Sequence, residues 1–162
     1  MRVKCHPKSS IILISSPLIY YTIKQAKESK YINRIVVSTD DPEIANLSVK
    51  FGAEVIKRPA RFATDKARTE LALIHILGVL ERKEGYKSDI VVTLEPTSPL
   101  RTVRLIDECI EKLIFSDADS VISVVETREC FGKIVEGGKF RYLSKNQPRR
   151  RQDREPLYKE SS

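Results

Sequence analysis

Residues 89–102, which read DIVVTLEPTSPLRT, constrain the fold of this chain more than any other stretch. An apolar, β-branched run at 90–94 ends abruptly at an acid and two prolines. Such a run is typical of a central strand that is buried on both faces. Pro96 and Pro99 lack the backbone N–H group that a ladder needs, and they restrict the residues before them to extended conformations. The sequence therefore predicts a buried strand at 90–94, followed by a rigid loop.

The loop after this strand is rich in polar side chains. In open α/β sheets, ligands bind at the carboxyl ends of the strands, so a crevice is expected at this loop. The alternative is a structural turn that leads into the next helix, because such residues are common between elements. The side chains expected to line the crevice are Glu95, Thr97, Ser98 and Arg101.

Strands and amphipathic helices alternate along the rest of the chain. Apolar residues at helical spacing predict helices at 17–29, 42–51, 69–82 and 103–115. Short β-branched runs predict strands at 35–38, 53–56 and 118–125, and two more with a glycine pair between them predict a hairpin at 133–141. The run at 11–14 is either an edge strand or a packed loop. This alternation predicts an α/β fold, with a mostly parallel sheet between two layers of helices.

The first predicted helix has one apolar face. Two serines at 15–16 precede Pro17, which predicts a serine cap and a proline in the first turn. Ile19, Ile23 and Ala26 repeat at helical spacing and form the predicted core face. The side chains expected to face water are Lys24, Gln25, Lys27 and Glu28.

Two aspartates, Asp40 and Asp65, lie near predicted strand ends, where a general base would meet a bound substrate. Each also lies close to the start of a predicted helix, and aspartate is among the strongest N-cap residues. We favour the capping interpretation for both.

The composition is that of a globular protein. The 162 residues are 41% hydrophobic and 31% charged, so the chain can bury a core without a disulfide or a metal. No apolar run reaches the length of a membrane span, and the N-terminus lacks the apolar segment of a secretory signal. The three cysteines and two histidines are far apart, so no metal site is expected from them. We therefore expect a single domain over residues 1–162, a cytoplasmic location and no membrane association.

The net charge of +7 favours an anionic partner. Nucleic acid, a membrane surface and a small polyanion such as a nucleoside triphosphate all carry suitable charge. The basic residues are densest at 141–159, in a polar segment of the kind that is more often solvated than part of a site.

Several short segments at predicted strand ends follow one another in a specific order. They are PLI at 17–19, YTI at 21–23, VVSTDD at 36–41, RP at 58–59, FATD at 62–65, EPTSPLR at 95–101, and RRQD at 150–153 with Tyr158. Together they resemble the acylneuraminate cytidylyltransferases, over roughly residues 8–158. The resemblance implies a Rossmann-like three-layer sandwich of the nucleotidyltransferase type.

The resemblance also implies a reaction and its site. A cytidylyltransferase of this family transfers CMP from CTP to a nonulosonic (sialic-type) sugar acid and releases pyrophosphate, with Mg²⁺ as the cofactor. It implies a homodimer in which the late basic segment reaches towards the partner. The catalytic residue would be Lys8, which also binds the nucleotide. The other nucleotide-binding residues would be Arg58, Ala67 and Thr69, and the sugar-binding residues Glu95, Thr97, Ser98, Arg101, Arg151 and Gln152.

This sequence departs from the family pattern at three places. The family begins with a strand and a glycine-rich phosphate loop, and residues 6–9, HPKS, stand where only the last part of that loop would fall, with Lys8 as the matching residue. Glu95 stands where the family usually has glutamine, so a charge would face the sugar carboxylate. The chain also ends before the carboxylates that hold magnesium in the family. We therefore expect a domain without the usual first strand, phosphate loop and C-terminal part, and we assign no metal ligand.

Two other functions stay open. One is a truncated or inactive relative that keeps the fold without turnover. The other, less favoured, is a basic α/β domain that binds nucleic acid through residues 149–159, a segment without the interleaved aromatic residues of a single-strand binding surface.

Overall fold

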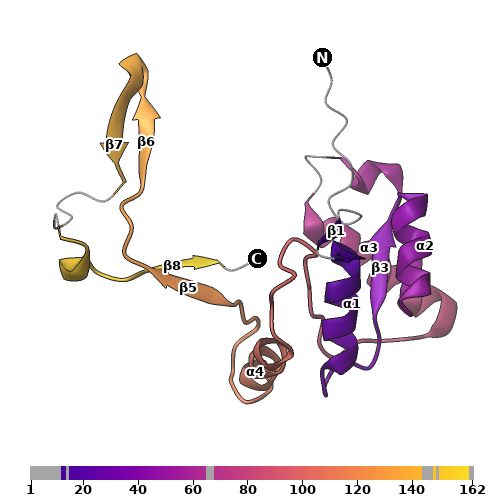
Figure 1. Ribbon diagram of the computed structural model, residues 1–162. Coiled ribbons are helices and arrows are strands. Elements are labelled where there is room, and N and C mark those ends of the chain that lie inside the picture. Colours follow the sequence, from indigo (N-terminus) through magenta and orange to yellow (C-terminus); the bar gives the residue numbers. More distant parts are fainter. Residues whose placement is uncertain (1–11, 14, 65–67, 144–147, 149, 161–162) are drawn as a thin grey trace. The chain divides into compact units, whose positions relative to one another are not determined.

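The structure is a computed structural model that describes residues 12–13, 15–64, 68–143, 148 and 150–160. These residues form two compact units, which divide between Val121 and Ile122 (Figure 1). The predictions for Lys8, Asp65 and Ala67 lie outside the described residues. The single domain over residues 1–162 stays a prediction.

The first unit contains all four predicted helices, each within two residues of its predicted ends. None of the helices in the described part of the chain is long and apolar enough to cross a membrane. In Figure 1, α1, α2 and α3 lie around β3. The elements are β1 (Ile12–Leu13), β2 (Ser16–Pro17), α1 (Leu18–Glu28), β3 (Val36–Thr39), α2 (Pro42–Lys50), β4 (Glu54–Lys57), η2 (Ala60–Phe62), α3 (Thr69–Glu84) and α4 (Val103–Ile114).

The start of α1 differs from the prediction. The predicted serine cap is wrong, because Ser16 and Pro17 form β2, which pairs with β1 in an antiparallel ladder. Pro17 itself is the N-cap residue, and no side chain caps this helix. The hydroxyl of Tyr21 donates to the Leu13 carbonyl at 2.7 Å, which ties the helix to β1. The predicted apolar face of α1 is confirmed, because Ile19, Ile23 and Ala26 are all buried.

The core of this unit lies between α1, α2 and the parallel pair of strands. Strands β3 and β4 pair in parallel, with Val36 opposite Glu54 and Thr39 opposite Lys57. Both strands lie within one residue of their predicted positions. The buried residues of the cluster are Ile19, Ile23 and Ala53, and Ile35, Val37, Leu47 and Phe51 pack against them.

Helix α2 begins at an aspartate, but not at the one that the sequence suggested. Asp41, rather than Asp40, is the N-cap residue, and its Oδ1 accepts from the N–H groups of Glu43 at 2.8 Å and Ile44 at 3.0 Å. Pro42 takes the first helical position, where its missing N–H costs nothing. The cap must be the residue directly before that proline, which is why the prediction for Asp40 is wrong.

The predicted central strand at 90–94 is also wrong. These residues make no ladder, and Val91 and Val92 are 46% and 37% exposed. A strand needs a neighbour whose N–H and C=O groups match its own. Among the described residues, the ladder of β3 runs to β4 on one edge, while segment 90–94 and β3 line a common cavity. The segment therefore faces β3 across a space instead of pairing with it.

An ion-pair cluster joins the region before β3 to the end of α3. The Arg34 guanidinium contacts the carboxylates of Glu54 at 2.6 Å and Glu84 at 2.8 Å, and it stacks 4.6 Å from the centre of the Tyr86 ring. The hydrogen bonds that its guanidinium donates to Glu54 and Glu84 hold the pKa of Arg34 well above its usual value. Helix α3 then ends at Gly85, whose φ of 64° is the left-handed conformation that glycine adopts without strain.

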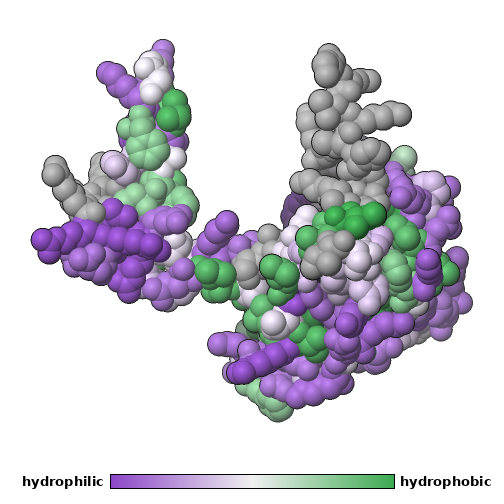
Figure 2. All heavy atoms as spheres, in the orientation of Figure 1, coloured by the Kyte–Doolittle hydropathy of each residue, from purple (hydrophilic) through white to green (hydrophobic). Residues whose placement is uncertain are grey.

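The second unit consists of two antiparallel ladders. Strand β5 (Val124–Thr127) pairs with β8 (Leu157–Glu160), and β6 (Gly132–Val135) pairs with β7 (Lys139–Tyr142). The 3₁₀ turns η3 (Glu136–Gly138) and η4 (Arg151–Asp153) connect these strands. The predicted hairpin is confirmed, whereas of the strand predicted at 118–125 only the last two residues pair. Figure 2 shows hydrophobic surface on the β6–β7 hairpin, where Ile134 and Phe140 are exposed.

Candidate functional site

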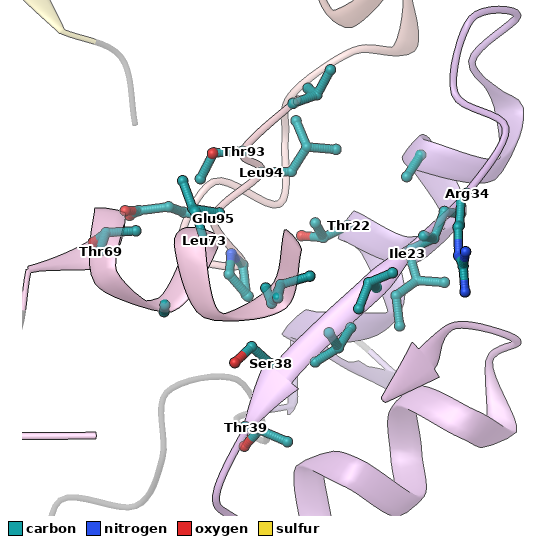
Figure 3. Close-up of a pocket in the computed structure, with 18 of the residues that line it drawn as sticks. Thr22, Ile23, Arg34, Ser38, Thr39, Thr69, Leu73, Thr93, Leu94 and Glu95 are labelled. Carbon is teal, nitrogen blue, oxygen red and sulfur yellow. The ribbon is translucent and has the colours of Figure 1, made fainter. Parts of the chain in front are cut away.

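A cavity of about 1010 Å³ lies in the first unit (Figure 3). Its lining comes from α1, β3, α3, the loop after β4 and the segment 88–97, with two residues from α4. Isoleucine, valine and leucine side chains supply much of this lining, and Ser38, Thr39 and Thr69 add hydroxyl groups. A cavity that combines apolar side chains with convergent polar groups has the general form of a small-molecule site.

Arg58 follows the last residue of β4 and is half-buried. Its backbone N–H donates to Thr39 O at 2.9 Å, which extends the parallel ladder by one bond. Its side chain turns back over β3, where Nη2 donates to Ser38 O at 2.6 Å and Nε donates to Ser38 Oγ at 3.3 Å. These two bonds use two of the five N–H donors of a guanidinium. Arg58 therefore lies at the carboxyl end of β3, where the fold places a ligand site.

Three more predicted residues share the cavity with Arg58. Thr69 is the first residue of α3, and Glu95 and Thr97 belong to the proline-rich loop. The Thr97 hydroxyl donates to Glu95 Oε2 at 3.3 Å, so this carboxylate already accepts a hydrogen bond. In Figure 3, Thr69 and Glu95 are drawn around the same cavity as Ser38 and Thr39. The structure thus brings Arg58 and Thr97, which lie 39 positions apart in the sequence, to one cavity.

The rest of the proline-rich loop is tied to α1 by a residue that the helical pattern assigned to solvent. Gln25 is half-buried, and its Nε2 donates to the carbonyls of Pro99 at 2.8 Å and Arg101 at 2.6 Å. Arg101 is partly buried, and this burial lowers the pKa of its guanidinium. Ser98 and Arg101 lie on the loop but not on the cavity lining. Nothing in the local sequence distinguished Gln25 from its water-facing neighbours on the helix.

The remaining predicted residues lie in the second unit or outside the described part of the chain. Lys8 and Ala67 lie outside the described part of the chain, so their roles stay predictions. Arg151 and Gln152 belong to η4 in the second unit, where both are exposed. The Gln152 carbonyl accepts from Arg128 Nη1 at 2.9 Å, which fixes the turn within its own unit.

The charges around the cavity are mixed. Arg34 is held by two glutamates, and Arg68 pairs with Glu70 at 3.1 Å, whereas the hydrogen bonds given for the Arg58 side chain go to the uncharged Ser38. The acids on the lining are Asp40, Asp41, Asp89 and Glu95. A triphosphate at this cavity would need more positive charge than Arg58 alone supplies.

The described residues hold no ready-made cluster of metal ligands. Mg²⁺ is usually bound through one or two carboxylates together with substrate phosphates and water. No group of three or more Asp, Glu, His or Cys side chains in the described ranges lies close enough together to hold a metal. One of the nearby carboxylates, that of Asp41, is already engaged in capping α2. We therefore derive no step of the reaction through a metal.

Comparison with known proteins decides the family. Residues 7–161 match the family model described as Cytidylyltransferase. The chain belongs to this family. The match extends over both units, and it confirms the family that the segment order predicted.

Three relatives of this cytidylyltransferase chain match it over part of their length. It is 36% identical to post-translational flagellin modification protein B of Campylobacter coli, over 68% of this chain and 48% of the relative. It is 35% identical to the CMP-N,N'-diacetyllegionaminic acid synthase of Legionella pneumophila, over 64% and 45%, and 32% identical to the N-acylneuraminate cytidylyltransferase of Escherichia coli, over 64% and 24%. The matches thus span between a quarter and a half of these relatives.

A solved structure gives the same fold. CMP:2-keto-3-deoxy-manno-octonic acid synthetase complexed with CTP aligns with a TM-score of 0.57 and 18% identity, over 72% of this chain and 43% of that chain. This likeness confirms the predicted α/β nucleotidyltransferase fold.

Proposed function

We propose that this chain transfers CMP from CTP to a nonulosonic sugar acid and releases pyrophosphate. The observation that carries the proposal is the family match over residues 7–161. The names of the relatives support the substrate class, because they include an N-acylneuraminate cytidylyltransferase and a CMP-legionaminic acid synthase. The aligned structure, which holds CTP, supports the nucleotide.

The proposed step is a displacement at phosphorus. The hydroxyl oxygen on the anomeric carbon of the sugar acid forms a bond to the α-phosphorus of CTP. The bond from that phosphorus to the bridging oxygen breaks, pyrophosphate leaves with the electron pair, and the hydroxyl proton is released. Negative charge develops on the phosphate oxygens, and the free donors of Arg58, together with Lys8, would stabilise it.

The test is pyrophosphate release by the purified chain with CTP and Mg²⁺. The sugar acids to supply are N-acetylneuraminate, diacetyllegionaminate, pseudaminate and 3-deoxy-manno-octulosonate. Release that requires both CTP and one acid would support the proposal. Saturable CTP binding without release, from folded protein, would instead identify an inactive relative. Binding to duplex DNA that weakens steeply with added salt would favour the nucleic-acid alternative.

Replacing Arg58 tests its assigned role. A hydrogen bond to a charged group contributes about 1.5–3 kcal/mol, so Arg58→Ala should lower kcat/KM roughly 10- to 150-fold. Lys8→Ala should lower it by a similar factor. The matched control is Lys57→Ala, which removes an exposed positive charge from the end of β4. Circular dichroism of each variant separates lost activity from lost folding, and unchanged kcat/KM in Arg58→Ala would remove Arg58 from the site.

Three further properties belong to the same proposal. We expect a homodimer, a cytoplasmic location and a requirement for Mg²⁺, each of which rests on the family resemblance. Light scattering of the purified chain measures the first, fractionation of the source cells the second, and addition of EDTA to the pyrophosphate assay the third.

A further inference from the structure

Gln25 is the residue that fixes the backbone of the proline-rich loop. Its amide nitrogen uses both N–H groups, one on Pro99 O and one on Arg101 O, across 74 and 76 positions of sequence. These two bonds measure 2.8 and 2.6 Å. They join the middle of α1 to the carbonyls that flank Leu100, a side chain that is itself 86% exposed.

The bonds within the loop are longer. Ser98 N donates to Glu95 O, and Arg101 N donates to Ser98 O, both at 3.3 Å. Arg101 Nη2 donates to Glu95 O at 3.4 Å. Because N–H···O bonds are strongest near 2.9–3.0 Å, the loop holds itself weakly and its shape depends on the shorter bonds from Gln25.

One donor of this loop is left without a partner in the described part of the chain. Arg101 Nη1 is buried and has no hydrogen-bond partner among the described residues. A buried guanidinium N–H without a partner is costly, and a carboxylate is the group that matches its geometry. The loop shape that Gln25 imposes thus leaves an unpaired, buried cationic donor two residues before the start of α4.

We propose that Gln25 is a positioning residue for the sugar acid, because it holds the loop at 95–101, whose Glu95 and Thr97 line the cavity. This inference rests on the proposed function for the identity of the substrate. The contact between Gln25 and the loop does not depend on turnover and is tested separately.

The variant to make is Gln25→Glu. It keeps the size of the side chain but places carboxylate oxygens against two carbonyl oxygens, so both bonds are lost. The matched control is Glu28→Gln, the reverse change on an exposed position of the same helix. Hydrogen–deuterium exchange of the full chain measures directly how well the loop backbone is protected. The Ser98 and Arg101 amides should exchange at least about tenfold faster in Gln25→Glu and at the wild-type rate in Glu28→Gln.

Steady-state kinetics test the positioning role of Gln25. In Gln25→Glu, KM for the sugar acid should rise about tenfold or more, while KM for CTP stays within about twofold. Gln25→Ala, which adds no charge, should likewise raise KM for the sugar acid and leave KM for CTP within about twofold. An equal rise in both KM values would show only a structural role and overturn the proposal, as would unchanged exchange in the loop. Absence of turnover in the wild type would remove the substrate role, while the exchange result would still decide the loop contact.

Discussion

Two adjacent aspartates show how much one residue can decide. Asp40 and Asp41 have the same chemistry, and both follow β3, but only Asp41 has its side chain over the first turn of α2. Thr39 supports this arrangement, because its Oγ1 accepts from the Asp41 N–H at 3.1 Å. Asp40 is exposed and lines the cavity, which leaves its carboxylate available for chemistry.

The pair allows a matched test at the residue scale. Asp41→Ala should lower the free energy of unfolding by about 1 kcal/mol, because two N–H groups of α2 lose their acceptor. Asp41→Asn should retain most of the stability, since asparagine caps nearly as well as aspartate. Asp40→Ala is the control and should change stability by less than about 0.5 kcal/mol. Urea denaturation measures all three, and equal losses in both alanine variants would contradict the assignment of the cap.

At the scale of elements, a polar junction joins the end of α1 to α4. Ser29 donates to Asp107 at 2.6 Å, and the Tyr31 hydroxyl donates to Glu111 at 2.8 Å. Lys30 contacts the same glutamate at 2.7 Å. The hydrogen bonds from Lys30 and Tyr31 lower the pKa of Glu111 below its ordinary value of 4.5. The junction orients α4 and, through the residues before it, the proline-rich loop.

The lowered pKa sets the direction of a pH effect. The native state favours ionised Glu111, so its contribution to stability is present above pH 4.5 and is lost as the pH falls through the lower native pKa. Glu111→Gln should therefore lower the melting temperature at pH 7, and the difference from the wild type should shrink at pH values below 4.5. Thermal melts between pH 7 and 3 measure this. Glu108→Gln, on the exposed side of the same helix, is the control, and a pH-independent difference for Glu111→Gln would contradict the argument.

At the scale of the whole molecule, the two units differ in what stabilises them. The first has a buried cluster around Ile19, Ile23 and Ala53. In the second, none of the described side chains is buried, and isolated two-stranded ladders are marginally stable in water. The second unit therefore depends on packing that its own residues do not supply. A partner chain could supply it, in line with the proposed homodimer.

Calorimetry tests this difference and the single-domain prediction together. A monomeric chain should show one unfolding transition with an enthalpy of about 85 kcal/mol near 60 °C, the value for roughly 120 ordered residues, rather than about 115 kcal/mol for the whole chain. The enthalpy should rise with protein concentration if dimerisation orders the second unit. Two separate transitions in the monomer would contradict the single domain.

Local pattern predicted the elements that depend on nearby residues. The apolar spacing of Ile19, Ile23 and Ala26 identified the buried face of α1, and the glycines at 137–138 identified the β6–β7 turn. The order of short segments predicted the family. These signals succeed because helix faces, turns and motifs are encoded within a few positions of sequence.

The sequence by itself determined the helices, the parallel pair β3 and β4, and the family. Only the tertiary structure decided the features that depend on residues distant in the sequence, such as strand pairing and contacts between a helix and a loop. Segment 90–94 has the composition of a buried strand, yet it makes no ladder, because a strand needs paired N–H and C=O groups beside it. Gln25 has the spacing of a solvent-facing residue, yet it holds a loop more than 70 positions away. Hydrogen bonds between such distant groups leave no periodic trace in the sequence, so only the folded chain shows them.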